Sequence, residues 1–156
     1  MSSVATAAPQ PFQSAASSRA AAIFTRVPMI ALSFVLTMIA LRYLLHPIEA
    51  ASAAGITFTS PGGITVARVG FAGFPLGFAA FFLSCLISQK RLLSGLNTEL
   101  SLLTIMIGVR LISMATLHSL ATAKLLAPEA VMAVLCVFAI RLELNRRRHQ
   151  QMRFAV

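Results

Sequence analysis

The chain has 156 residues, of which 58% are hydrophobic and 11% charged, and 13 basic residues against four acidic ones give a net charge of +9. This hydrophobicity excludes a disordered chain, and the charged fraction is about half that of a typical soluble domain. The apolar runs are too long for a nucleic-acid-binding protein, so we expect no nucleic-acid partner. The remaining class is an integral membrane protein, whose first partner is the lipid bilayer.

The first 26 residues are rich in Ala and Ser and contain no acidic residue. They have no hydrophobic periodicity, so we expect a disordered tail over 1–26. A transit peptide is the alternative interpretation, but Arg19 and Arg26 are few for one.

The first apolar run, 28–45, forms a helix of about 27 Å, which is long enough to span the hydrocarbon core. Pro28 suits the first helical turn, and Pro47 closes the run. The small residues 51–53 resemble a signal-peptidase site. The run is longer than the apolar part of a usual signal peptide and contains Arg42, so we expect an uncleaved helix.

The second run, 69–89, has no charged residue over its whole length. It is the clearest spanning segment in the chain, and Pro75 inside it predicts a kink. The connection before it, 48–63, is the longest and ends in the turn signal Ser60-Pro61-Gly62-Gly63.

The third run, 100–123, is interrupted only by Arg110. We expect Asn97 and Thr98 to cap this helix, and Glu99 to lie at the positive end of its dipole.

The fourth run begins at Pro128-Glu129, stays apolar to Ile140 and then becomes basic, which predicts a helix over 128–148. The fold class is therefore all-α, an integral membrane four-helix bundle. We expect a transmembrane domain over 27–145 and a basic tail over 146–156.

The basic residues near the helix ends predict the orientation, because they accumulate on the cytoplasmic side of membrane proteins. With the N-terminus inside, the inner side collects nine basic residues: Arg19, Arg26, Lys90, Arg91, Arg141, Arg146, Arg147, Arg148 and Arg153. The outer side collects three: Arg42, Arg68 and Lys124. This bias predicts both termini in the cytoplasm, across a bacterial inner membrane.

Small residues line one side of the second and third helices and predict where these helices pack, because they let backbones approach closely. The expected helix-packing glycines are Gly70, Gly73, Gly77 and Gly108. The phenylalanines beside the small residues of the second helix then face lipid. The alternative is that they line a pocket for a flat ligand such as a quinone. Cys85 and Cys136 are expected to be free thiols at different membrane depths.

Arg110 lies about 16 Å from either end of its predicted helix, too deep to reach the interface easily. A charge at that depth costs at least ~2.5 kcal/mol unless it is paired or solvated. No acidic residue of the other helices lies at the same predicted depth. Arg110 must therefore meet backbone carbonyls, a carboxylate or water.

The outer half gathers the other polar residues, and an Arg68–Glu129 ion pair between the second and fourth helices is the preferred hypothesis. It is either a structural clamp or part of an outward-facing polar pocket under the 48–63 loop. The candidate polar cluster comprises Arg68, Glu129, Arg110, His118, Arg42 and His46, with Glu49 on the loop.

No catalytic, metal or cofactor motif is recognisable in the chain. The three histidines lack ligand spacing, and no nucleophile motif, phosphate-binding loop or paired carboxylates occur. We therefore predict no catalytic residue, no metal site and no cofactor.

Several residues together resemble a family of small bacterial four-helix membrane proteins catalogued only as a domain of unknown function. The resemblance covers about 28–145 and consists of Ala67-Arg68 leading into Gly70, Gly73 and Gly77, a central Arg110, and Pro128-Glu129 opening the last helix. It implies a four-span bundle in the inner membrane and no particular activity, and Arg68, Arg110 and Glu129 match its polar positions.

The sequence thus favours a non-enzymatic membrane protein that acts through helix packing, as a homo-oligomer or as part of a larger membrane complex. One alternative is a small-solute or proton channel or carrier with Arg110 lining a polar path. A second is a membrane enzyme or binding protein for a lipid or quinone.

Overall fold

The computed structural model describes residues 21–118, 120 and 122–154. Residues 1–20 of the expected tail lie outside the described part, and residues 21–24 form a helical turn that leads into the first long helix. Every element of the described part is helical, which confirms the all-α fold class. In chain order the elements are α2 (Val27–Leu45), α3 (Pro47–Ala53), α4 (Pro61–Arg68), η1 (Val69–Gly73), α5 (Phe74–Ile87), α6 (Gln89–Leu117), η2 (Ala123–Leu125) and α7 (Leu126–Phe154).

Four helical segments of the described chain are long and apolar enough to cross a membrane. They are Ala21–Leu45, Pro61–Ile87, Gln89–Leu117 and Ala123–Arg148. Each is at least 25 residues long, so each exceeds the hydrocarbon thickness of about 30 Å. The chain is therefore a multi-pass membrane protein whose apolar helices contact the lipid bilayer.

The second spanning helix begins earlier than its apolar run predicts. Ser60 caps α4, because its hydroxyl accepts a hydrogen bond from the backbone N–H of Gly63 at 3.3 Å, and Pro61 occupies the first turn. The expected turn signal is thus a helix start. Residues Val69–Gly73 form a π-helical turn just before Pro75, which is the irregularity that this proline introduces.

The third spanning helix is displaced toward the N-terminus relative to its predicted bounds of 100–123. It begins at Gln89, directly after the extended residue Ser88, and ends at Leu117, because the next residue, His118, has a φ of 46° in the left-handed region. Asn97 and Thr98 are therefore in the interior of α6 and do not cap it. The prediction failed because neither Gly nor Pro marks either end.

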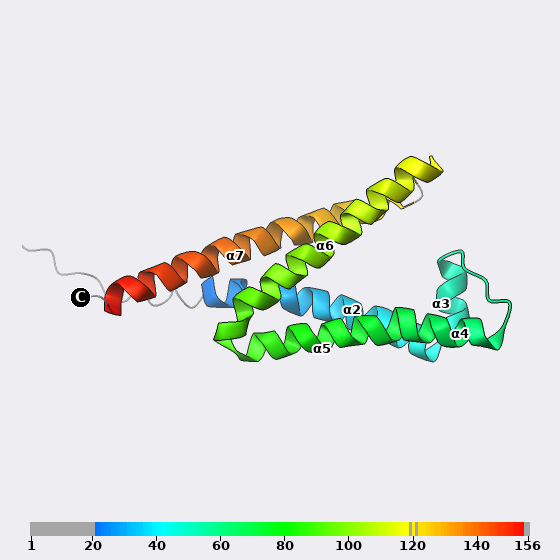
Figure 1. Ribbon diagram of the computed structural model, residues 1–156, viewed down its shortest axis with the longest axis horizontal. Helices are drawn as coiled ribbons and strands as arrows, with labels where there is room; N and C mark the ends of the chain where they lie inside the picture. Colours follow the sequence, from blue (N-terminus) through cyan, green and yellow to red (C-terminus); the bar gives the residue numbers. More distant parts are fainter. Residues whose placement is uncertain (1–20, 119, 121, 155–156) are drawn as a thin grey trace, which may run out of the picture.

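The helices form two antiparallel pairs that lie together at one end and diverge at the other (Figure 1). α2 packs along α5, and α6 packs along α7. They converge at the "basic end", which we define by the turn at Ser88 and the last turns of α7, where the Arg147 guanidinium donates to the carbonyl of Gln89 at 2.7 Å. At the opposite "loop end", α3 and α4 lie far from the connection between α6 and α7.

The core lies where the four helices converge. Its fully buried members include Met29, Phe82, Leu92, Leu96 and Cys136, from all four spanning helices. Each helix contributes side chains at helical three- and four-residue spacing.

Gly95 is the glycine that close packing requires. A Cβ at this position would collide with Cε of Met29 and would lie 2.8 Å from Cβ of Cys85. The predicted packing of the small stripes is wrong, because a Cβ on any of Gly70, Gly73, Gly77 or Gly108 would meet nothing within 4 Å. The face of α6 that packs against the other helices carries larger side chains, such as Leu92, Leu96 and Leu103. Small residues on the other side of α6, such as Ser101 and Thr104, are exposed.

The two cysteines are free thiols, as predicted, and both are buried. Their predicted separation in depth is wrong. Cys85 packs against Gly95 of α6. The thiol of Cys136 donates to the carbonyl of Leu96, the residue after Gly95, at 3.1 Å. Both sulfurs therefore lie near one level of α6.

Candidate functional site: the polar seam between α6 and α7

The buried faces of α6 and α7 meet along a line that carries most of the chain's acidic residues; we call this line the seam. On α6 the seam follows three- and four-residue steps through Leu92, Leu96, Glu99 and Leu103 and reaches Arg110. On α7 it follows Glu129, Cys136, Ala139 and Glu143 in the same way. This spacing keeps one stripe of each helix facing its partner, as in a coiled coil.

Arg110 and Glu129 form a two-pronged ion pair at the loop end of the seam. Nε of Arg110 donates to Oε2 of Glu129 at 3.0 Å, and an Nη donates to Oε1 at 2.6 Å. The two side chains are only 19% and 12% exposed. Such parallel, charge-assisted bonds are about twice as strong as neutral ones and fix the geometry of both groups.

This pair replaces the predicted Arg68–Glu129 pair, which is wrong. Arg68 lies at the end of α4, in the other helix pair, and is exposed. Arg110 lies seven residues before the end of α6, and Glu129 three residues after the start of α7, so both lie within about 10 Å of the same connection. The expectation that no acidic residue shares the depth of Arg110 came from placing the end of α6 too late.

The pairing also changes the interpretation of Arg110. A guanidinium that is bonded to both oxygens of a carboxylate has its charge compensated and two of its five N–H donors bonded. An unpaired arginine in a membrane span requires water or a polar path to compensate its charge, whereas the charge of Arg110 is compensated by Glu129 within the chain.

Glu143 closes the seam at the basic end, and its side chain is almost fully buried. Arg146 donates to its carboxylate at 3.1 Å and Arg147 at 2.9 Å, from the next turn of the same helix. Because Arg147 also bonds the carbonyl of Gln89, this cluster attaches the last turns of α7 to the start of α6. The arginines of the predicted 146–156 tail thus belong to a helix that continues to Phe154.

Glu99 lies between these two charged clusters and is the site residue that the sequence reasoning missed. It was assigned to the first turn of a helix, but it lies ten residues into α6 and its exposed fraction is 0%. Neither carboxylate oxygen has a hydrogen-bond partner in the described part of the chain. An available signal was the position of Glu99 one turn after Gly95 and Leu96, on a face that continues to Leu103.

The remaining predicted polar residues do not form one cluster with Glu129. His46 and Glu49 lie at the corner between α2 and α3, with Nδ1 and Oε2 3.8 Å apart, and both side chains are largely exposed. They border a hollow of about 540 Å³ together with Arg68. Arg42 is exposed on α2, and His118 is exposed at the end of α6.

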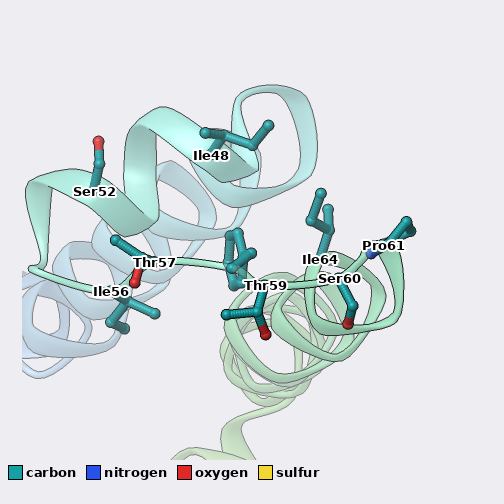
Figure 2. A pocket seen from close by; sticks show the side chains of 9 residues that line it. Ile48, Ser52, Ile56, Thr57, Thr59, Ser60, Pro61 and Ile64 are labelled. Atoms are coloured by element: carbon teal, nitrogen blue, oxygen red, sulfur yellow. The ribbon is translucent and has the colours of Figure 1, made fainter.

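A second hollow of about 450 Å³ lies beside the first, between α3, the following loop and the start of α4. Figure 2 shows its lining side chains, among them Ile48, Ser52, Thr57, Thr59 and Ile64. Hydroxyl and aliphatic groups and the ring of Phe58 line it, and no charged residue does. It therefore offers a shallow, weakly polar surface at the loop end, separate from the seam.

Among the described residues, no group of three or more His, Cys, Asp or Glu side chains is placed to hold a metal ion. No protein-family model, curated protein or solved structure matches this chain. The chemistry of the site therefore consists of a neutral Arg110–Glu129 pair, a Glu143 cluster whose two arginines leave it a net charge of +1, and one buried carboxyl group between them.

Proposed function

We propose that this chain is a non-enzymatic protein of the bacterial inner membrane that acts by packing against a further transmembrane helix, supplied by a second copy of itself. Both termini lie in the cytoplasm in this proposal. The clustering of Lys90, Arg91 and Arg146–Arg148 at the basic end supports that orientation, because such residues favour the cytoplasmic side.

The observation that carries the proposal is an open groove along α5. Gly73, Gly77 and the phenylalanines Phe74, Phe78 and Phe81 line it, with Thr98 of α6 at one edge, and its volume is about 390 Å³. Phe74 is 67% exposed, and a Cβ added at either glycine would have no atom within 4 Å. Small residues four positions apart allow two membrane helices to approach closely, and large side chains beside them supply contact area.

Gly95 shows how this chain uses a glycine that it packs internally. There, two neighbouring helices come so close that a single methyl group would collide with them. The α5 groove has the same residue type and an adjoining apolar rim, but no helix of the described chain occupies it. A second copy supplies the same groove, so two copies can pair through identical surfaces, which is the commonest arrangement of homodimers.

Cysteine crosslinking in membranes tests the proposal. Gly73→Cys and Gly77→Cys should give a covalent dimer with a short thiol crosslinker. The wild-type chain serves as background because Cys85 and Cys136 are buried. Gly108→Cys is the matched control, because Gly108 is also uncovered but does not border the groove.

A larger crosslinked-dimer fraction for Gly73→Cys and Gly77→Cys than for the wild type and Gly108→Cys supports the homo-oligomer. A reproducible adduct with another membrane protein at these two positions, and not at 108, replaces the second copy by a larger complex. If positions 73 and 77 give no more crosslinked product than position 108, the packing role of the groove is refuted.

A further inference from the structure

We propose that Glu99 is a proton-binding site within the bundle, which holds its carboxyl group in the neutral form and exchanges its proton with the solution. The starting observation is a contrast among the four glutamates. Glu49 has His46 nearby, Glu129 bonds Arg110, and Glu143 bonds Arg146 and Arg147. Glu99 is fully buried, and both of its oxygens are unpartnered in the described chain.

The surroundings of Glu99 disfavour its charged form. Transfer of an isolated carboxylate out of water costs far more free energy than transfer of any neutral polar group. A carboxylate in such surroundings therefore takes up a proton and becomes neutral. Binding one proton converts –COO⁻ to –COOH and removes the charge without any movement of the helices. The same argument does not apply to Glu129, because the guanidinium of Arg110 compensates its charge.

A second unpartnered polar group lies at the same level. Met29 of α2 reaches Gly95 of α6, and both helices run in the same direction from the basic end. One turn further on, α2 presents Ser33 and α6 presents Glu99. The hydroxyl of Ser33 is also buried and also lacks a hydrogen-bond partner in the described part. The level of Glu99 is thus the part of the bundle where two buried polar side chains lack a partner in the described chain.

The chemistry of the site favours a proton over a metal ion. One carboxyl and one hydroxyl group are too few ligands for a dehydrated cation, which requires several oxygens. The titratable groups on the elements packed around this level are the thiols of Cys136 on α7 and Cys85 on α5, and Glu143, which two arginines already hold. α2 contributes Ser33. Of the charged residues on this spanning helix, Arg26 lies about two turns before Ser33 and its buried Nε has no hydrogen-bond partner in the described part, and Arg42 is exposed about two and a half turns after Ser33.

The position relative to the basic end gives the proton a route. Glu99 lies about 15 Å along α6 from Gln89, where the Arg147 guanidinium reaches the turn between α5 and α6. In this proposal the proton exchanges at this end through local opening of the last turns of α7, past the buried Leu92 and Leu96. The proposal concerns the seam and is independent of the α5 groove, so failure of the dimer test leaves it standing.

Infrared spectroscopy of the full chain in lipid vesicles tests the inference. A protonated carboxyl group gives a carbonyl stretch that carboxylates lack, and we expect this band in the wild type and its loss in Glu99→Gln. The band should shift in D2O if the proton exchanges. Glu129→Gln is the matched control and should keep the band.

A chemical test needs no variant that could fail to fold. Dicyclohexylcarbodiimide reacts with protonated carboxyl groups in apolar surroundings, so mass spectrometry of the wild type should find its adduct on Glu99 and not on Glu129. Absence of both the band and the adduct overturns the proposal, as does equal labelling of the two glutamates. Protection by sodium chloride, but not by choline chloride at the same pH, also overturns it and assigns the site to a metal cation.

Discussion

The two halves of α6 hold their neighbours in different ways. From Gln89 to Leu103, one face of α6 packs against the other spanning helices, and Leu92, Gly95 and Leu96 on that face are buried. Beyond Leu103 it has only α7 beside it, and Ile112 and Leu117 are largely exposed. The first half is held by close packing and the second by the Arg110–Glu129 pair. Where lipid surrounds a helix pair, burying apolar side chains between the helices gives little stabilisation, because lipid is equally apolar. One strong polar interaction between the helices therefore contributes a larger share of their association.

The largest expected effect comes from removing one partner of the ion pair. Arg110→Leu leaves the mostly buried carboxylate of Glu129 uncompensated, so we expect the free energy of unfolding to fall by about 3 kcal/mol. Unfolding in mixed detergent micelles, followed by circular dichroism, measures this loss. Arg42→Leu is the control, because Arg42 is exposed on α2.

The double variant Arg110→Leu with Glu129→Leu sharpens this test. It removes both charges, and replacing a whole ion pair by apolar groups is often neutral. We therefore expect it to recover most of the lost stability. A double variant as unstable as the single one would show that the pair is not what holds the second half of α6.

The next largest effect concerns the packed half. Gly95→Ala places a methyl group against Met29 and Cys85, and we expect a loss of about 1–3 kcal/mol from overpacking. At Gly108 the added methyl group would have no atom within 4 Å. The free energy of unfolding of Gly108→Ala should therefore stay unchanged or rise by at most about 1 kcal/mol, because Ala favours the helix more than Gly does. Equal losses at both positions, measured in the same micelles, would contradict the contrast between the two halves.

A smaller effect is expected at Glu99, although its side chain is fully buried. If its carboxyl is neutral, Glu99→Gln keeps size and charge, and the free energy of unfolding should change by less than about 1 kcal/mol. Glu129→Gln breaks a true ion pair and should cost about 3 kcal/mol. Comparable losses for the two glutamines would mean that Glu99 is charged in the folded protein.

The smallest effect is expected at the loop end. His46 and Glu49 are 3.8 Å apart and largely exposed, and exposed pairs contribute little because water screens them. Glu49→Ala should change the free energy of unfolding by less than about 0.5 kcal/mol, at low and high salt alike. A larger, salt-dependent loss would show that this corner helps to hold α3 in place.

Much of the fold was readable from the residues themselves. The four apolar runs predict four spanning helices because a bilayer accepts only segments that satisfy their own backbone hydrogen bonds. Pro28, Pro47 and Pro75 marked a helix start, a helix end and an irregular turn, since proline lacks an N–H and restricts its neighbours. The polar site was only partly readable: Arg110 and Glu129 were singled out, but Glu129 was given the wrong partner.

The amino-acid sequence by itself determined that the protein is an all-α, multi-pass membrane protein, because composition and run length decide whether a helix prefers lipid. Only the tertiary structure decided which side chains meet. In lipid a helix is apolar on every side, so the sequence pattern does not show which face is buried. The left-handed residue His118, which neither Gly nor Pro announces, ends α6 early and brings Arg110 level with Glu129. The same displacement moves Glu99 from a helix end into the core.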